Sequence, residues 1–231
     1  MIHDTDHPHQ GQPVINKGKP LEKAKGVVIL LHGRGATAES ILTLAIELQK
    51  TGDGQTAHQA HGGSLVDLAW MAPQASFNTW YPYSFLSPPE QNEPGLSSVF
   101  QVIEELIDQV TEAGILKKNI VLAGFSQGAC LASEFAARNP DRYGGVVALS
   151  GGLMGPEVDP GRYSGSMEGT PVFFGCSDYD HYIPEERVHE SAELFERIGA
   201  DVTKKIYEGL GHTVNKDEFR HFHEILTNIG I

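Results

Sequence analysis

A serine flanked by two glycines lies where an apolar strand is expected to end and a helix to begin. Residues 121–123 are apolar, 124–128 read Gly-Phe-Ser-Gln-Gly, and 129–138 are rich in small, helix-compatible residues. In this context a Gly-x-Ser-x-Gly sequence holds the serine on a sharp, strained turn, with its hydroxyl clear of the sheet. We therefore predict that Ser126 is a nucleophile. The simpler interpretation is a serine in an ordinary strand-to-helix turn.

Base and acid candidates follow two later strands, in the order that a serine nucleophile requires. The apolar run at 171–175 is followed by Asp178 and Asp180, and the run at 202–207 leads into a short loop that carries His212. Sites in open α/β sheets lie at the carboxyl ends of the strands. A histidine oriented by a carboxylate can take the proton of the serine. We predict His212 as the base, and a surface loop histidine is the alternative.

An early glycine-rich loop supplies the remaining chemistry. The strand expected at 27–31 is followed by His-Gly-Arg-Gly at 32–35. The oxygen of a tetrahedral intermediate carries negative charge and needs preorganised N–H donors. Such donors come from the residue after the nucleophile and from an early strand-to-helix loop. We expect the backbone N–H groups of Gln127 and Arg34 to form this oxyanion hole; the alternative is a plain glycine-rich turn.

These segments together resemble the phospholipase/carboxylesterase family of α/β-hydrolases, which includes bacterial carboxylesterases and acyl-protein thioesterases. In that family the acid lies four residues before a proline, here Pro184. The resemblance therefore implies a triad of Ser126, His212 and Asp180, with Asp178 as the alternative acid. The matching stretches, which together span the chain from about residue 26 to its end, are 31–35, 72–74, 80–81, 124–128, 150–152, 180–184 and 207–212.

An aromatic loop at 74–95 is the expected wall of a substrate pocket. Ester pockets are largely apolar with a few polar anchors. The other interpretation is that these aromatic residues pin the long loop to the body of the protein. The predicted pocket residues, which include two that follow the strand ending at Ser150, are Trp80, Tyr81, Phe85, Leu153 and Met154.

Strand and helix patterns alternate along the chain and predict a single-domain α/β-hydrolase fold. Strands are expected at 27–32, 68–73, 121–125, 145–150, 171–175 and 202–207, and helices at 37–50, 97–113, 129–138, 185–198 and 216–229. This alternation favours a mainly parallel, doubly wound sheet flanked by helices, with no large cap domain. Residues 1–25 read as an N-terminal polar segment or edge hairpin, and 26–231 as the hydrolase domain.

Composition limits the partners. The 231 residues hold 17 Lys and Arg against 30 Asp and Glu, a net charge of −13, which argues against binding to nucleic acid or to anionic membranes. No apolar run is long enough for stable membrane insertion and no signal peptide is recognisable, so we expect a cytoplasmic protein. Cys130 and Cys176 read as reduced thiols. His3, His7 and His9 are more typical of a loose terminus or edge hairpin than of a metal site.

The sequence thus predicts a serine hydrolase that cleaves small-molecule carboxylic esters of short acyl chain, without metal or cofactor. An acyl-protein thioesterase, a lysophospholipase and a lactone hydrolase share the triad and remain alternatives, as does a catalytically inactive binding module on the same fold. A monomer and a homodimer are both left open.

Overall fold

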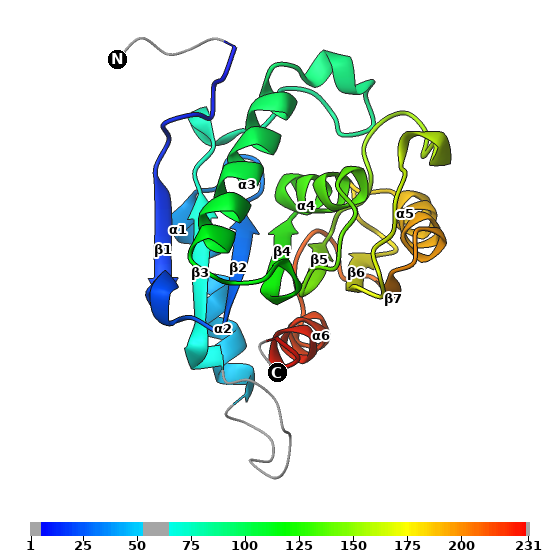
Figure 1. Cartoon of the computed structure of the whole chain (residues 1–231). Helices are drawn as coiled ribbons and strands as arrows, with labels where there is room; N and C mark the ends of the chain where they lie inside the picture. Colours follow the sequence, from blue (N-terminus) through cyan, green and yellow to red (C-terminus); the bar gives the residue numbers. More distant parts are fainter. Residues whose placement is uncertain (1–5, 53–64, 230–231) are drawn as a thin grey trace.

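The computed structural model describes residues 6–52 and 65–229, and these form a seven-stranded sheet with helices on both faces (Figure 1). The strand order is β1-β3-β2-β4-β5-β6-β7, and only β1 runs antiparallel to its neighbour among these strands. The strands are β1 Val14–Gly18, β2 Gly26–Leu31, β3 Leu68–Pro73, β4 Ile120–Phe125, β5 Gly145–Leu149, β6 Pro171–Ser177 and β7 Asp201–Tyr207. The predicted single-domain α/β fold with a mainly parallel sheet is confirmed.

Two hydrophobic clusters, one on each face of the sheet, hold the helices. Helices α3 (Gly95–Glu112), α4 (Gln127–Arg138) and α5 (Glu185–Arg197) pack on one face. Helices α1 (Ala38–Ile41), α2 (Thr43–Gly52) and α6 (Lys216–Thr227) pack on the other. Strands β2, β3 and β5 are buried along their whole length because helices cover both of their faces. Every α-helix in the described part of the chain packs on a face of the sheet, so none of them forms a cap domain.

The amino-terminal segment is more ordered than its composition suggests. It contributes the edge strand β1, which pairs with β3 from Val14↔Pro73 to Gly18↔Ala69. Before that strand His9 is buried: its Nε2 donates to the carbonyl of Trp80 at 2.7 Å, and its Nδ1 accepts from the N–H of Ser76 at 3.2 Å. His9 is therefore a packing residue, while His3 lies outside the described residues. No group of His, Cys, Asp or Glu suited to a metal occurs among the residues that the structure describes.

Two of the differences from the predicted helix boundaries have a clear cause in the structure. The helix expected at 37–50 is divided at Leu42 into α1 and α2, and a capping box between Thr37 and Ser40 starts the first of them. Helix α3 begins at Gly95, two residues before the predicted start at 97, and the Ser98 hydroxyl does not cap it because it is buried and accepts the N–H of His9. Most of the segment between α2 and β3, residues 53–64, lies outside the described residues. None of the described helices is long and apolar enough to cross a membrane.

Candidate active site

Ser126 lies on a strained turn between β4 and α4. Its backbone has φ 56° and ψ −120°, a conformation that residues with a side chain rarely adopt. The turn is tight enough to require both flanking glycines. A Cβ on Gly124 would lie 2.3 Å from the carbonyl carbon of Gly128, and a Cβ on Gly128 would lie 2.1 Å from the carbonyl oxygen of Leu31. The sequence context therefore produces the nucleophile-elbow geometry.

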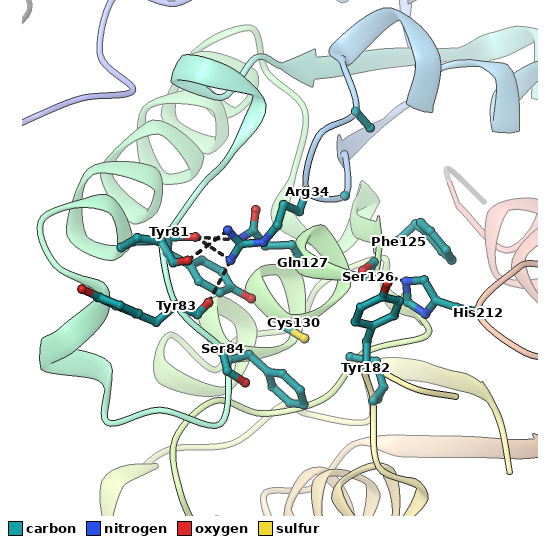
Figure 2. Close-up of a pocket in the computed structure, with 15 residues that line it drawn as sticks. Arg34, Tyr81, Tyr83, Ser84, Phe125, Ser126, Gln127, Cys130, Tyr182 and His212 are labelled. Atoms are coloured by element: carbon teal, nitrogen blue, oxygen red, sulfur yellow. Dashed lines mark hydrogen bonds between the residues drawn. The ribbon is translucent and has the colours of Figure 1, made fainter. Parts of the chain in front are cut away.

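A chain of two hydrogen bonds joins Ser126, His212 and Asp180 (Figure 2 shows the first two residues). The Ser126 Oγ lies 2.8 Å from His212 Nε2, and His212 Nδ1 lies 2.7 Å from Asp180 Oδ2. These side chains come from the ends of β4, β6 and β7, which meet at one edge of the sheet. With Nδ1 protonated toward the carboxylate, Nε2 is free to accept the serine proton.

The Asp180 carboxylate is held ionised although its side chain is fully buried. Burial opposes ionisation, but the hydrogen bonds from His212 and from the backbone N–H groups of Tyr182 (2.9 Å) and Ile183 (3.1 Å) outweigh it and lower the pKa of Asp180. Asp178 does something else: its Oδ1 accepts the N–H of Gly209 at 2.8 Å and ties the two loops together. The structure therefore places Asp180, and not Asp178, against His212.

Two backbone N–H groups beside Ser126 are available to an oxyanion. Gln127 is the first residue of α4, and Arg34 follows β2; within the described residues neither backbone N–H donates to a protein acceptor. The N-terminus of α4 adds a partial positive charge at the same place. The predicted pair of donors thus lies beside the serine, at positions that can receive a developing negative charge.

A pocket of about 580 Å³ opens over these residues. Of the predicted pocket residues, Tyr81 and Phe85 line it. Trp80, Leu153 and Met154 do not: Trp80 is 1% exposed and donates its indole N–H to the carbonyl of His32, and the other two are fully buried in the core. Their apolar character reflects packing of the loops and not contact with substrate, which corrects the prediction for these three.

The structure also reveals pocket residues that the sequence reading missed. Cys130 lies one helical turn after Ser126 and lines the pocket; burial raises the pKa of its thiol to about 12, so it remains a neutral apolar surface. Tyr182, from the acid loop, packs edge-on against His212 with ring centroids 4.9 Å apart. The four-residue spacing of Cys130 from the nucleophile was the available signal. Figure 2 shows both side chains around the serine.

The Arg34 side chain has a different role from its backbone N–H, because it binds the aromatic loop. Its guanidinium donates to three successive carbonyls of the aromatic loop, those of Tyr81 (2.8 Å), Pro82 (3.0 Å) and Tyr83 (2.8 Å), as the dashed lines in Figure 2 indicate. The Gln127 amide also bridges to this loop, donating to the carbonyl of Tyr81 and accepting the N–H of Trp80, both at 2.9 Å. Both predicted oxyanion residues therefore also fix the pocket wall.

A mostly parallel sheet covered on both faces, with a serine on a strained strand-to-helix turn, defines an α/β-hydrolase. The chain belongs to the phospholipase/carboxylesterase family, whose sequence profile matches residues 11–229. This is a family of serine hydrolases that includes esterases and acyl-protein thioesterases.

Individual relatives agree with this assignment. The chain is 39% identical to a phospholipase/carboxylesterase of known structure from Dyadobacter fermentans, with a TM-score of 0.84 over 94% of this chain and 97% of that one. It is 29% identical over 225 residues to acyl-protein thioesterase 1 of Kluyveromyces lactis, covering 93% of this chain and 95% of the other. A probable carboxylesterase of Oryza sativa is 28% identical over 137 residues, 59% of this chain and 51% of that protein.

Proposed function

We propose that this protein is a carboxylesterase that cleaves esters of short acyl chain through a covalent acyl-enzyme on Ser126. The observation that carries the proposal is the Ser126–His212–Asp180 hydrogen-bond chain, which opens onto a pocket with apolar walls. The lining of that pocket includes two buried side chains, Phe85 (5% exposed) and Cys130 (1% exposed). We expect these side chains to limit the length of acyl chain that the pocket can bury.

The geometry supports acylation followed by deacylation. As the Ser126 Oγ attacks the ester carbonyl, its proton passes to His212 Nε2, and the oxyanion receives the N–H groups of Gln127 and Arg34. When the carbonyl–alkoxy bond breaks, His212 returns that proton to the departing alcohol. Water then repeats the sequence: its proton goes to His212, its oxygen attacks the acyl carbon, and His212 protonates Ser126 as the acid leaves. Asp180 stabilises the imidazolium in each step.

Thioester hydrolysis is the second candidate, supported by the acyl-protein thioesterase relatives. The same groups serve it, because a thioester forms the same acyl-enzyme, and a departing thiolate, which is less basic than an alkoxide, depends less on protonation by His212. The two functions differ in the length of the acyl chain that the pocket accepts and in the size of the leaving group, a small alcohol or a thiol on a larger molecule.

Ser126 itself is tested by covalent labelling. A fluorophosphonate should attach to one serine, and mass spectrometry of the digested protein should locate it at Ser126. The Ser126→Ala variant should stay folded, take no label, and lose p-nitrophenyl acetate turnover by on the order of 10³ or more. A folded Ser126→Ala variant with near wild-type turnover would overturn the proposal, and an unlabelled wild-type protein would favour the inactive binding module.

A further inference from the structure

A second hollow of about 400 Å³ adjoins the first one. Its walls come largely from the opposite side of the sheet: Ile41 of α1, Leu44 of α2, and Val214 and Phe219 at the start of α6. The described residues that line it include no Asp, Glu, Lys or Arg. This hollow, called the second pocket below, is therefore an apolar recess beside the active site that the proposed mechanism has not used.

The two pockets meet at the reacting groups. Gly33, Ala36, Phe125 and His212 line both of them. Figure 2 shows Phe125 and His212 on one side of Ser126, away from the side chains of the aromatic loop. A substrate bound on the serine thus has two directions in which to extend, one into each pocket.

The positions of the donors decide which part of the ester extends into which pocket. Ser126 and both oxyanion residues, Arg34 and Gln127, line the first pocket and not the second. His212 lines both. Because His212 must protonate the leaving oxygen, the alcohol lies on the histidine side of the tetrahedral centre, and the acyl chain lies on the side of the serine and the oxyanion donors.

We propose that the second pocket binds the alcohol part of the ester, a specificity that rests on the proposed esterase function. Its mainly apolar walls favour an uncharged, apolar alcohol of about the size of a benzyl or short alkyl group, because a charged group there would lose hydration and meet only the hydroxyls of Ser40 and Thr213 and the His212 ring, with no Asp, Glu, Lys or Arg among the described lining residues. A glycerophosphate leaving group, as in a lysophospholipid, would be disfavoured for the same reason.

Partitioning of the acyl-enzyme provides a direct test. With phenyl acetate as the acyl donor, the acetyl-enzyme is attacked either by water, giving acetate, or by added benzyl alcohol, giving benzyl acetate. In the second route the proton of the alcohol passes to His212 and then to the Ser126 Oγ, and the acyl–serine bond breaks as the new ester bond forms. The ratio of the two products at a fixed alcohol concentration reports binding of the alcohol alone, because the acyl group is the same in both routes.

Two variants change the second pocket in opposite ways, and one serves as a control. Leu44→Ala removes part of its wall and Val214→Phe fills it. Ile46→Ala is the matched control, since Ile46 lies on α2, is 54% exposed and lines neither pocket. We expect the ratio of benzyl acetate to acetate to fall about threefold to tenfold in the first two variants and to stay at the wild-type value in Ile46→Ala. The preference for methyl hexanoate over methyl acetate should not change.

Each other outcome has a distinct meaning. An unchanged product ratio in folded Leu44→Ala and Val214→Phe proteins overturns the assignment of the second pocket. A changed acyl-length preference with an unchanged product ratio places the acyl chain there and also overturns it. Failure of the wild-type protein to form any acetyl-enzyme contradicts the proposed esterase function itself, which quenched-flow mass spectrometry of the phenyl acetate reaction detects separately.

Discussion

Two carboxylates lie two residues apart in the loop after β6, and their surroundings assign them different tasks. Asp180 accepts the Nδ1–H of His212 and two backbone N–H groups, whereas Asp178 accepts the N–H of Gly209. The first arrangement fixes the tautomer and orientation of the imidazole, and the second joins two loops.

These surroundings predict opposite results from the same substitution. Asp180→Asn should lower kcat for p-nitrophenyl acetate by on the order of 10³–10⁴, because an amide favours the wrong imidazole tautomer. Asp178→Asn is the matched control: the amide oxygen can still accept from Gly209, so kcat should stay within about threefold of wild type. Steady-state kinetics on both purified variants measures the difference. A large loss in Asp178→Asn with little loss in Asp180→Asn would reverse the assignment.

For the individual site residues, the sequence predicted correctly those positions that depend on local backbone geometry. The elbow around Ser126 needs glycines at fixed positions, and the acid and histidine loops follow strands whose ends share one edge of the sheet. These features predicted that the candidates meet, while the choice of Asp180 over Asp178 came from the family resemblance. The prediction that Trp80 lines the pocket was wrong, because the sequence does not distinguish an aromatic loop residue that faces substrate from one that packs into the core. The difference arises from His9 and His32, distant in sequence, which pack against the Trp80 ring at centroid distances of 5.2 and 4.8 Å.

Among the secondary-structure elements, α6 begins with a buried acid. Glu218 is fully buried; one carboxylate oxygen completes the capping box with Asn215, and the other has no hydrogen-bond partner among the residues that the structure describes. Burial raises the pKa of Glu218 to about 7, and the N–H of Asn215 opposes this only in part. Because the folded pKa lies above the unfolded one, its stabilising contribution is complete below about pH 4.5 and is lost as the pH rises through 7.

Replacement of this acid should therefore stabilise the protein at alkaline pH. Glutamine keeps the acceptor that the capping box requires and has no charge to bury. We expect Glu218→Gln to raise the free energy of unfolding by about 1–3 kcal/mol at pH 8 and by less at pH 5. Urea unfolding at both pH values measures this, with the exposed Glu224→Gln on the same helix as control. The variant is compared with wild type at each pH, so contributions from His9 and His32, whose pKa values burial lowers, cancel. Equal effects at the two pH values would contradict the interpretation.

Among the side chains that bond to the backbone of the aromatic loop from outside it, Arg34 spans the most carbonyls. Arg34 spans three carbonyls of this loop with charge-assisted bonds. Arg34→Ala should loosen the pocket wall and lower kcat/KM by about tenfold, mainly through KM, because each such bond contributes roughly 1–2 kcal/mol. The backbone N–H at this position remains, so Ser126 should still react with a fluorophosphonate.

Limited proteolysis provides the second readout for the Arg34 clamp. Cleavage within the loop at 79–95 should be faster in Arg34→Ala and similar to wild type in Arg220→Ala, which removes an exposed arginine from α6. Lysine should rescue only in part, since its single ammonium cannot span three carbonyls. Wild-type KM and cleavage rate in Arg34→Ala would show that packing and the Gln127 hydrogen bonds hold the loop without Arg34.

Strands and helices, like the site residues, could be predicted where neighbouring residues determine them and not where a distant part of the chain does. Strands β2, β3 and β5 were predictable as apolar runs because both of their faces are covered. The edge strand β1 was not, because only two of its five residues are even partly buried and its pairing with β3 is set by a partner more than fifty residues away. The start of α3 was displaced for a similar reason, since Ser98 is engaged by His9 and not by the helix N-terminus.

Considered as a whole, the molecule covers its sheet with all its described helices and leaves the strand ends at the active site open. The first pocket is consequently lined by loop residues together with buried residues of the core. We expect an acyl chain to gain binding energy only until it reaches a floor formed by the buried lining residues Phe85, Cys130 and Ile183, which are 5%, 1% and 3% exposed. Acyl length is therefore the property that most directly reports the shape of the whole site.

We expect kcat/KM for p-nitrophenyl esters to rise with acyl length and peak between about two and six carbons. Each methylene that the pocket buries contributes about 0.8 kcal/mol, or roughly a fourfold gain, and a methylene that projects into water contributes nothing. Phe85→Leu lowers the floor and should move the peak to longer chains by about one or two carbons. Phe100→Leu is the matched control, because Phe100 on α3 does not line the pocket. An efficiency that climbs steadily to palmitoyl esters in the wild-type protein would contradict the short floor and favour the acyl-protein thioesterase or lysophospholipase alternative.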